Sequence, residues 1–352
     1  DVNAAALRES RVVRSGVGMV DVTTLGKIDI QGPDAAEFLN RVYINGWKKL
    51  AVGKARYGVM LREDGMVYDD GTASRLAENH FVMTTTTANA GLVLAKLEYY
   101  LQAVWPHLRV QVTSVTDQYA AIAVAGPKSR DVMEQLVDID ISNEAFPFMA
   151  AAPCRFVGIA DARLFRISFS GELAYEINLP ADYGQAAWDA LLENGVGVYG
   201  MEALGTLRIE KGHVAGPEIT GQTTARDLGL GGLQSKLKHY IGKGLATREG
   251  LIDPSRPAIV GLVPVDGKTW IKAGAQLVEN SDAPPPVVML GHVTSIAFSG
   301  EMGHPIALAL LSGGKDRHGD ELYAAFPLSH EAVKVRVVSP HFVDPDGERM
   351  RV

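Results

Sequence analysis

The first third of the sequence carries a pattern of hydrophobic and polar positions that recurs later. Polar and apolar side chains alternate over residues 27–30, as in a half-buried strand, before Gly32-Pro33 interrupts them. The stretch PDAAEFLNRV then predicts a helix with Pro33 in its first turn and an apolar face formed by Ala35, Phe38, Leu39 and Val42. Strand, Gly-Pro and helix return in the same order at residues 122–136, with Val132, Met133 and Leu136 on one face. Two copies of one unit predict a pseudo-symmetric domain whose halves are separated by an insertion.

The insertion, residues 51–115, has the pattern of an antiparallel sheet with helix on one face. Its strand-like stretches are RYGVML, MVYDDGTASRL and HFVMTTTT. Residues 90–104 then carry apolar side chains at helical spacing, and residues 108–115 predict a further strand. Strands that follow one another without alternating helices indicate an α+β fold rather than a doubly wound α/β fold.

The rest of the sequence returns to the first domain and then becomes β-rich. RLFRISF and LAYEINL predict paired strands, Asp182 is placed to cap a helix, and residues 201–211 predict another helix. From residue 256 on, short apolar runs set off by Gly, Pro or Asp predict a small β-sandwich or barrel. We therefore expect three domains: a discontinuous first domain of residues 1–50 and 116–250, an inserted domain of residues 51–115, and a last domain of residues 251–352.

Composition narrows the classes of partner. The formal net charge of −7 gives no electrostatic reason to bind nucleic acid or an anionic membrane. The single cysteine, Cys154, excludes an internal disulfide, and the nine histidines show no metal-ligand spacing, so we expect no metal. Neither an export leader nor a membrane-spanning run is visible, which predicts a cytoplasmic protein. The sequence opens on a helical pattern without Met, which suggests a fragment of a longer chain.

Candidate chemistry centres on Asp69-Asp70, which ends an apolar run just before Gly71. Adjacent side chains on a strand point to opposite faces, so one carboxylate looks inward and its pKa should rise. The alternative is a turn with Asx hydrogen bonds. Thr84 to Thr87 offer hydroxyls on both faces of a strand and Glu176 lies on another, although threonine is also a common strand former and a strand glutamate is usually solvated. The glycine-rich stretches lack dinucleotide and phosphate-loop fingerprints, and Ser170 has no nucleophile elbow.

Several motifs together resemble the aminomethyltransferase family, which includes the glycine-cleavage T-protein and the folate domains of sarcosine oxidase. They are SGVGMVDVTTLGKIDIQGPDAAEFLN, RYGVMLREDGMVYDDG, IAVAGPKSRDV, FRISFSGELAYEI, LRIEKG and GHVTSIAFSGEMGHPIALAL. LGKIDIQGPDAAEFLNR, HFVMTTTT, AFPFM and FRISFSGELAYEIN are more similar to the C-terminal portion of the sarcosine oxidase large (alpha) subunit than to the T-protein.

The resemblance implies a fold and a site. The fold would be three domains around a central tetrahydrofolate pocket, with a ferredoxin-like second domain and a C-terminal β-barrel. By motif position Asp70 would be catalytic beside N10 of the folate, and Glu176 would bind the pterin. Further pocket-lining positions would be Tyr57, Leu25, Thr72, Thr85 and Phe169.

Two departures from the T-protein pattern bear on function. Phe169 stands where T-proteins often have Tyr, and Ala203-Leu204-Gly205 replaces their Ala-Arg-Asp, which disfavours a lipoyl-protein substrate. The resemblance implies capture of an iminium or formaldehyde equivalent from sarcosine oxidation as 5,10-methylenetetrahydrofolate. Any flavin or NAD would be held by upstream sequence or by flavoprotein oxidase subunits. The alternatives are a stand-alone aminomethyltransferase or demethylase, and a folate-binding scaffold without catalysis.

Overall fold

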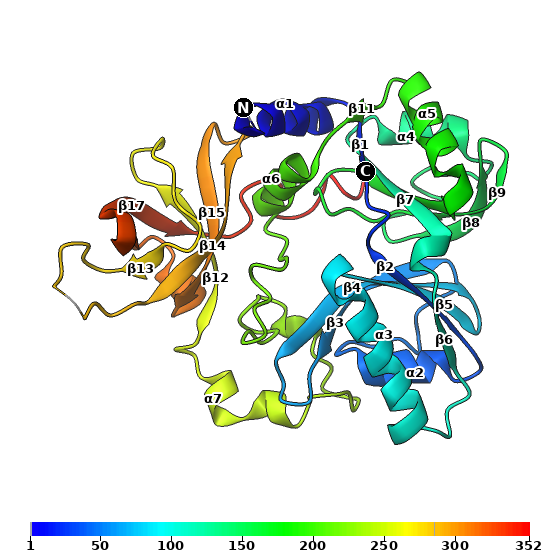
Figure 1. The fold of residues 1–352 in the computed structure, drawn as a ribbon, viewed down its shortest axis with the longest axis horizontal. Coiled ribbons are helices and arrows are strands. Elements are labelled where there is room, and N and C mark those ends of the chain that lie inside the picture. Colours follow the sequence, from blue (N-terminus) through cyan, green and yellow to red (C-terminus); the bar gives the residue numbers. More distant parts are fainter. Residues whose placement is uncertain (1, 285) are drawn as a thin grey trace.

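The computed structural model describes residues 2–284 and 286–352, which form two open sheets and a closed barrel arranged around a central region (Figure 1). The first sheet has the strand order β11-β1-β7-β10-β9-β8. Its apolar face packs on helices α4 and α5 through Val124, Met133, Ile177 and Leu191. The elements are β1 (Gly18–Asp21), β7 (Tyr119–Ala125), α4 (Ser129–Leu136), β8 (Ala151–Phe156), β9 (Ile159–Phe165), β10 (Ala174–Pro180), α5 (Gly184–Glu193) and β11 (Gly197–Val198).

The second sheet has the order β3-β4-β5-β2-β6, with every pair of neighbours antiparallel. Helices α2 and α3 cover one of its faces, where Phe38, Leu39 and Leu97 pack on Ile28 and Met83. The predicted α+β class is confirmed. The elements are β2 (Gly26–Gln31), α2 (Ala35–Val42), β3 (Lys54–Leu61), β4 (Val67–Ala77), β5 (His80–Thr85), α3 (Ala90–Tyr99), continued by a π-helical turn, Tyr100–Val104, and β6 (Gln111–Ser114).

The repeated strand-GlyPro-helix units lie in different sheets, which corrects the expectation that they share one domain. β2 pairs with β5 and β6, so residues 26–42 belong with the segment predicted as the insertion rather than with residues 116–250. Each unit instead supplies one strand and one helix to its own sheet. The sequence pattern is local, whereas sheet membership is decided by the long-range pairing of Ile28 with Met83 and Ser114.

Two helix starts also differ from the prediction. Helix α2 begins at Ala35 after Asp34, so Pro33 precedes the helix instead of occupying its first turn. Helix α5 begins at Gly184 after Tyr183 and has no side-chain cap, so Asp182 does not cap it. Both starts lie within two residues of their predicted positions, as expected when helix ends are set by local geometry.

The C-terminal barrel is closed, with the order β12-β15-β14-β13-β16-β17, and confirms the predicted β-barrel. Its interior is filled by apolar side chains that include Val260, Leu277, Ala309 and Val335. The strands are β12 (Pro257–Pro264), β13 (Gln276–Val278), β14 (Gly291–Ser299), β15 (His304–Ser312), β16 (Glu321–Phe326) and β17 (Glu331–Val338).

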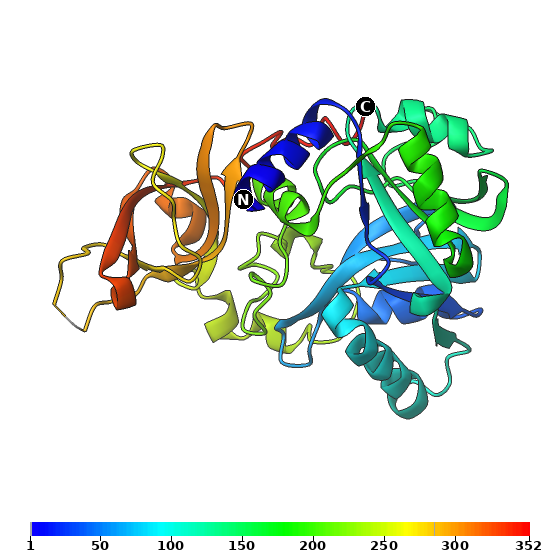
Figure 2. The same ribbon diagram turned by 45° about the horizontal axis from the view of Figure 1, so that its top comes forward.

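Two helices and a long segment connect the sheets with the barrel. Helix α1 (Val2–Ser15) packs along α6 (Met201–Lys211) and reaches β14 (Figure 1, Figure 2). Residues 212–248 between α6 and the barrel contain only short turns of helix. Among the described residues no helix has the length and hydropathy needed to cross a bilayer. The short helices are Thr87–Asn89, Thr116–Gln118, Ala181–Tyr183, Gly231–Leu233, Leu245–Thr247, α7 (Glu249–Ile252), Gly314–Arg317 and Pro327–Ser329.

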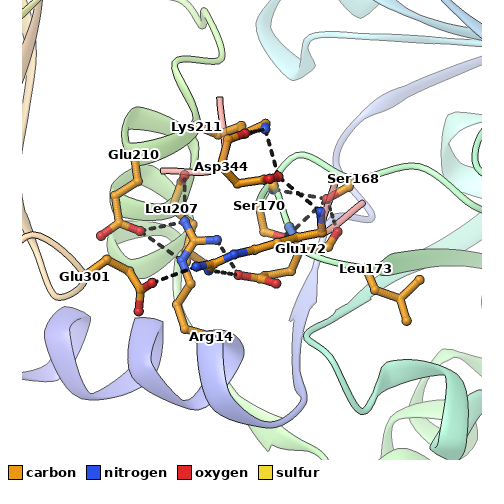
Figure 3. Close-up of polar contacts among 12 residues, drawn as sticks. Arg14, Ser168, Ser170, Glu172, Leu173, Leu207, Glu210, Lys211, Glu301 and Asp344 are labelled. Atoms are coloured by element: carbon orange, nitrogen blue, oxygen red, sulfur yellow. Dashed lines mark hydrogen bonds and ion pairs between the residues drawn. The ribbon is translucent and has the colours of Figure 1, made fainter. Parts of the chain in front are cut away.

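A buried ionic cluster fastens these parts together (Figure 3). Arg14 of α1 binds Glu172, in the loop before β10, at 2.7 Å and Glu210 of α6 at 2.6 Å. Arg349, in the C-terminal segment that returns from the barrel, binds Glu172 at 2.8 Å. The side chains of Arg14, Glu172 and Glu210 are 6%, 5% and 1% exposed. Because buried charges are costly unless they are paired, this cluster fixes the relative positions of the elements that carry it.

Replacing Arg14 with Met should lower the free energy of unfolding by about 3–5 kcal/mol, because it leaves two buried carboxylates without their shared cation. Urea unfolding followed by circular dichroism measures this. Arg8→Met is the matched control, since Arg8 lies on the same helix with its side chain 72% exposed. Equal unfolding midpoints for Arg14→Met and wild type would show that the cluster does not stabilise the fold.

Candidate active site between the two sheets

The site lies where the polar faces of the two open sheets meet. Successive side chains of a strand point to opposite faces of its sheet. In each sheet the apolar side chains face the covering helices, and the side chains between them in sequence lie on the opposite face. In the second sheet Lys27 pairs with Thr84, and both flank positions whose side chains, Ile28 and Met83, lie in the apolar core. In the first sheet Glu176 and Asn178 alternate with the core residues Tyr175, Ile177 and Leu179. An ion pair between Arg163 of β9 and Asp29 of β2, at 3.2 Å, links the two polar faces.

One narrow cavity is lined from both sheets. The second sheet contributes Thr72, Ser74, Val82 and Thr84, and the first contributes Phe165, Ile167, Glu176 and Asn178. Five of these eight side chains carry a hydroxyl group, an amide or a carboxylate. The lining of the cavity therefore combines hydrogen-bonding groups with apolar side chains.

Asp70 lies two residues before Thr72 on the same face of β4. Its side chain is half-buried and accepts a hydrogen bond of 2.7 Å from the hydroxyl of Tyr57. Burial, the largest cause, and the charge of Asp69 together raise the pKa of Asp70 to about 6, although the hydrogen bond from Tyr57 lowers it. A carboxylate of this kind can take up a proton near neutral pH.

Asp69 points to the other face of β4 and is fully engaged there. It accepts hydrogen bonds from the hydroxyl of Thr86 at 2.6 Å and from the side-chain amide of Asn89 at 3.1 Å. Burial raises its pKa as well. Because β4 continues through both aspartates, the interpretation of Asp69-Asp70-Gly71 as a turn is wrong.

Gly71 allows β4 and β5 to approach closely beside Asp70. A Cβ atom at this position would lie 2.2 Å from the carbonyl oxygen of Thr84. With the strands so close, the hydroxyl of Thr84 accepts a hydrogen bond from the backbone N–H of Thr72 at 3.0 Å and lies 3.1 Å from the hydroxyl of Thr72. These two threonines are thereby held at the cavity wall.

Glu176, in the cavity wall, and Lys27 are both buried, and each influences the pKa of the other through its charge. Burial raises the pKa of Glu176, while a hydrogen bond from Asn178 at 3.2 Å and the charge of Lys27 lower it. Burial lowers the pKa of Lys27, and Glu176 is the largest opposing influence. The ammonium of Lys27 donates to the carbonyl oxygens of Thr23 at 2.7 Å and Leu25 at 3.0 Å. Sequence reasoning missed Lys27, although a lysine at an inward position of an alternating strand is a signal that could have found it.

The structure brings together some of the predicted site residues and separates others. Tyr57 contacts Asp70, and Thr72 and Glu176 line one cavity. Leu25 accepts a hydrogen bond from Lys27 through its carbonyl oxygen but is not one of the residues that line the cavity. Thr85 points away from the cavity into the helix-covered side, since a Cβ atom on Gly26 would lie 2.1 Å from its hydroxyl, and Thr84 takes the place predicted for it.

Phe169 is 45% exposed and stacks on the ring of His213 at 5.8 Å between ring centroids. Burial lowers the pKa of His213 to about 4, and its ring also contacts the carbonyl oxygen of Phe169 at 3.1 Å. Phe169 is not one of the residues that line the cavity. Among residues 2–284 and 286–352 no group of three or more His, Cys, Asp or Glu side chains is arranged to hold a metal ion.

Two family models cover most of the chain. The GCVT N-terminal domain matches residues 1–238, and the glycine cleavage T-protein C-terminal barrel domain matches residues 258–344. The chain belongs to the aminomethyltransferase family. That family binds tetrahydrofolate, so the chain is an aminomethyltransferase-like folate-dependent domain.

Known proteins similar to this aminomethyltransferase-like domain fall into two groups. Sarcosine oxidase subunit alpha of Rhizobium meliloti (strain 1021) is 50% identical over 98% of this chain and 36% of its own length. Aminomethyltransferase of Deinococcus deserti is 31% identical over 87% of this chain and 80% of its own length. The crystal structure of glycine cleavage system aminomethyltransferase T from Bartonella henselae covers 97% of this chain and 90% of its own, with a TM-score of 0.84 and 27% identity. The chain thus spans about a third of the sarcosine oxidase relatives.

The raised pKa of Asp70 predicts a pH-dependent cost to stability. Its folded-state pKa of about 6 lies above an unfolded value of about 3.9, so the folded state holds the proton more tightly. The stabilisation that proton binding at Asp70 gives to the folded state is complete below pH ~4 and is lost as the pH rises through ~6. The side chain of the Asp70→Asn variant does not titrate. The free energy of unfolding of the variant, relative to that of wild type, should therefore increase by about 2–3 kcal/mol when the pH is raised from ~4 to ~7.

Urea unfolding at a series of pH values measures this difference. Asp131→Asn, an exposed acid in the first turn of α4, is the control and should follow wild type. A constant difference between Asp70→Asn and wild type over this pH range would mean that the Asp70 carboxyl is well solvated.

Proposed function

We propose that the aminomethyltransferase-like domain captures an iminium or formaldehyde equivalent on bound tetrahydrofolate and forms 5,10-methylenetetrahydrofolate. The observation that carries the proposal is the position of Asp70, a half-buried carboxylate with a pKa raised to about 6, beside a cavity that also contains the buried acid Glu176. Asp70 is suited to proton transfer and Glu176 to binding. Because the two carboxylates lie on different sheets, they suit a ligand that extends from a pterin to an arylamine.

Asp70 is proposed as the general base. A folate nitrogen that attacks an iminium carbon must lose a proton as the C–N bond forms, and the carboxylate accepts that proton. The second folate nitrogen then closes the methylene bridge as the original amine leaves, or as water leaves where formaldehyde is the donor. A positioned base of this kind contributes about 10²- to 10⁴-fold to the rate. The hydrogen bond from Tyr57 orients the Asp70 carboxylate, and the same bond keeps the pKa from rising out of the useful range.

Glu176 is proposed to bind the pterin. An ionised carboxylate accepts two parallel hydrogen bonds from the 2-amino group and N3–H of the pterin ring. That role requires the negative charge, which burial disfavours and which Lys27 and Asn178 favour. Lys27 is therefore a positioning residue, since it acts through Glu176.

The source of the one-carbon unit is proposed from the relatives. Similarity to sarcosine oxidase subunit alpha supports sarcosine oxidation as the source, with flavin or NAD held by other sequence or by flavoprotein oxidase subunits. A stand-alone aminomethyltransferase or demethylase is the second candidate, favoured by the near-complete overlap with aminomethyltransferase T. Formaldehyde and a lipoyl-protein methylamine donor, offered separately to the purified chain with tetrahydrofolate, distinguish the two.

Glu176→Gln should weaken tetrahydrofolate binding by about 1.5–3 kcal/mol, because an amide N–H would face the pterin donors in place of a carboxylate oxygen. Isothermal titration calorimetry measures the affinity, and thermal unfolding reports whether the fold survives. Glu193→Gln at the exposed end of α5 is the control. If the wild-type midpoint rises with NAD or ATP and stays unchanged with tetrahydrofolate, the proposed function is wrong.

Asp70→Asn should separate binding from chemistry. The amide keeps the shape and hydrogen-bonding capacity of the side chain but takes up no proton at neutral pH. We expect tetrahydrofolate affinity within about tenfold of wild type and a fall of about 10²-fold or more in the formation of methylenetetrahydrofolate. A coupled dehydrogenase that reduces NADP follows the product, and an enzyme-free blank corrects for spontaneous condensation.

Asp131→Asn again serves as the control in this assay. Asp69→Asn tests the opposite face of β4 and should act mainly on stability, because Asp69 is engaged by Thr86 and Asn89. A turnover rate unchanged in Asp70→Asn would favour the folate-binding scaffold without catalysis.

A further inference from the structure

Asp69 is a buried acid on the apolar side of the second sheet. Together with Gly71 and Ala73 it lies on the face of β4 that the helices cover, and it is only 1% exposed. An ionised carboxylate in such a place is costly unless hydrogen bonds or a cation replace its lost hydration. An apolar side chain would cost less there, so packing alone does not account for an acid at this position.

Hydrogen bonds replace that hydration at the start of helix α3. The carboxylate of Asp69 accepts from the hydroxyl of Thr86 at 2.6 Å, from the backbone N–H of Thr86 at 3.2 Å and from the side-chain amide of Asn89 at 3.1 Å. Asn89 is the residue that immediately precedes α3. The positive end of the helix dipole therefore also favours a negative charge on Asp69.

No cation neutralises this charge. In the part of the chain that the structure describes, neither Asp69 nor Asp70 forms an ion pair with a lysine, arginine or histidine, and Lys96 of α3 is paired with Glu63 at 2.8 Å. The titratable side chains that interact with the two carboxylates are three tyrosines, Tyr43, Tyr57 and Tyr68. Burial, and next the charge of the nearby acids, raises the pKa of each phenol, so all three are neutral at physiological pH.

The backbone of β4 holds the two acids at a fixed separation. Asp69 and Asp70 are consecutive, so their Cα atoms lie about 3.8 Å apart. Their register partners on β3 are Met60 and Val59, which keeps both residues in the same ladder. Because Asp69 points to the face opposite the cavity, it acts on Asp70 through its charge and does not touch the reacting atoms.

We propose that Asp69 is a positioning residue for the reaction, whose carboxylate, held ionised by Thr86 and Asn89, makes Asp70 a better proton acceptor. The inference rests on the proposed function, because it concerns the strength of the proposed general base. An acid beside a fixed negative charge ionises against repulsion and therefore binds a proton more tightly. Two acids with such different surroundings divide the roles, so that Asp69 stays charged and Asp70 exchanges the proton.

The test first measures the proton affinity of Asp70 through stability, without using turnover. The free energy of unfolding in urea is compared, over a series of pH values, between each protein and the same protein carrying Asp70→Asn. The pH at which this difference levels off is the folded-state pKa of Asp70, about 6 in wild type. Asp69→Asn keeps the shape of the side chain but removes its charge, so this pKa should fall by about one pH unit.

The second readout is the pH dependence of methylenetetrahydrofolate formation with tetrahydrofolate bound. In Asp69→Asn the rise of the rate with pH should move down by the same amount, about one pH unit. The rate above the rise should fall by less than about tenfold, in contrast to the larger loss expected for Asp70→Asn. Asp131→Asn, which removes an exposed acid of α4, should keep the wild-type profile.

An exchange of side chains separates charge from packing. Asp69→Asn/Asn89→Asp swaps the carboxylate and the amide across their 3.1 Å hydrogen bond and leaves the net charge unchanged. The pKa of Asp70 should then return at least half-way to the wild-type value, because a carboxylate again lies at the start of α3. If Asp69→Asn does not fold, Thr86→Val takes its place. It removes the shortest hydrogen bond to Asp69 and should lower the pKa of Asp70 by a smaller amount.

The outcomes separate this inference from the proposed function. The same pKa of Asp70 in Asp69→Asn and in wild type would overturn the inference, while turnover by wild type would leave the proposed function standing. An exchange variant that behaves like Asp69→Asn would also overturn the inference, since lost packing would then explain the effect. If wild type forms no methylenetetrahydrofolate, the proposed function fails and the role of Asp69 in that reaction fails with it, whatever the unfolding data show.

Discussion

One guanidinium, that of Arg14, sits where three separate parts of the molecule converge. Its two carboxylate partners lie in different elements, Glu172 in the loop that leads into β10 and Glu210 in α6. Glu210 also accepts a hydrogen bond from Ser299 at the end of β14, which ties the barrel to the same point. Because β10 carries Glu176, the position of this carboxylate, to which we assign pterin binding, is linked to the remote ion cluster. Side chains outside the cavity thus contribute to its geometry.

The site itself arises from the way in which each sheet divides its side chains. One face of each sheet packs against helices and forms the apolar core. The other faces of the two sheets carry polar residues and face each other across the cavity. Burial raises the pKa values of both Asp70 and Glu176, and the neighbours Tyr57 and Lys27 oppose the rise. The raised pKa suits the proton acceptor proposed at Asp70, whereas Glu176 depends on Lys27 and Asn178 to favour the charge that its proposed role requires. The same local rule of alternation produces both the core and the reactive surface.

Much of this arrangement could be predicted from the sequence, because the signals are local. The buried face of α2 and the β-rich barrel follow directly from hydrophobic periodicity. The sheet that β2 joins could not be predicted, since it depends on pairing with strands more than 50 residues away. The choice between Thr84 and Thr85 failed for a related reason, because a shift of one residue reverses the face of a strand. Placing Asp70 and Glu176 together required the family resemblance, as neither residue is distinctive alone.

The Arg14 cluster also has a consequence for how the chain acquires its fold. Arg14 is separated from Glu172 by 158 residues and from Glu210 by 196, and β1 pairs in parallel with β11 across a comparable length of chain. During synthesis on the ribosome, α1 therefore emerges well before any of its charged partners exists. Contacts of such long sequence separation slow folding and prolong the life of partly assembled states. The nascent domain should consequently remain a client of chaperones until α6 and the barrel have been made.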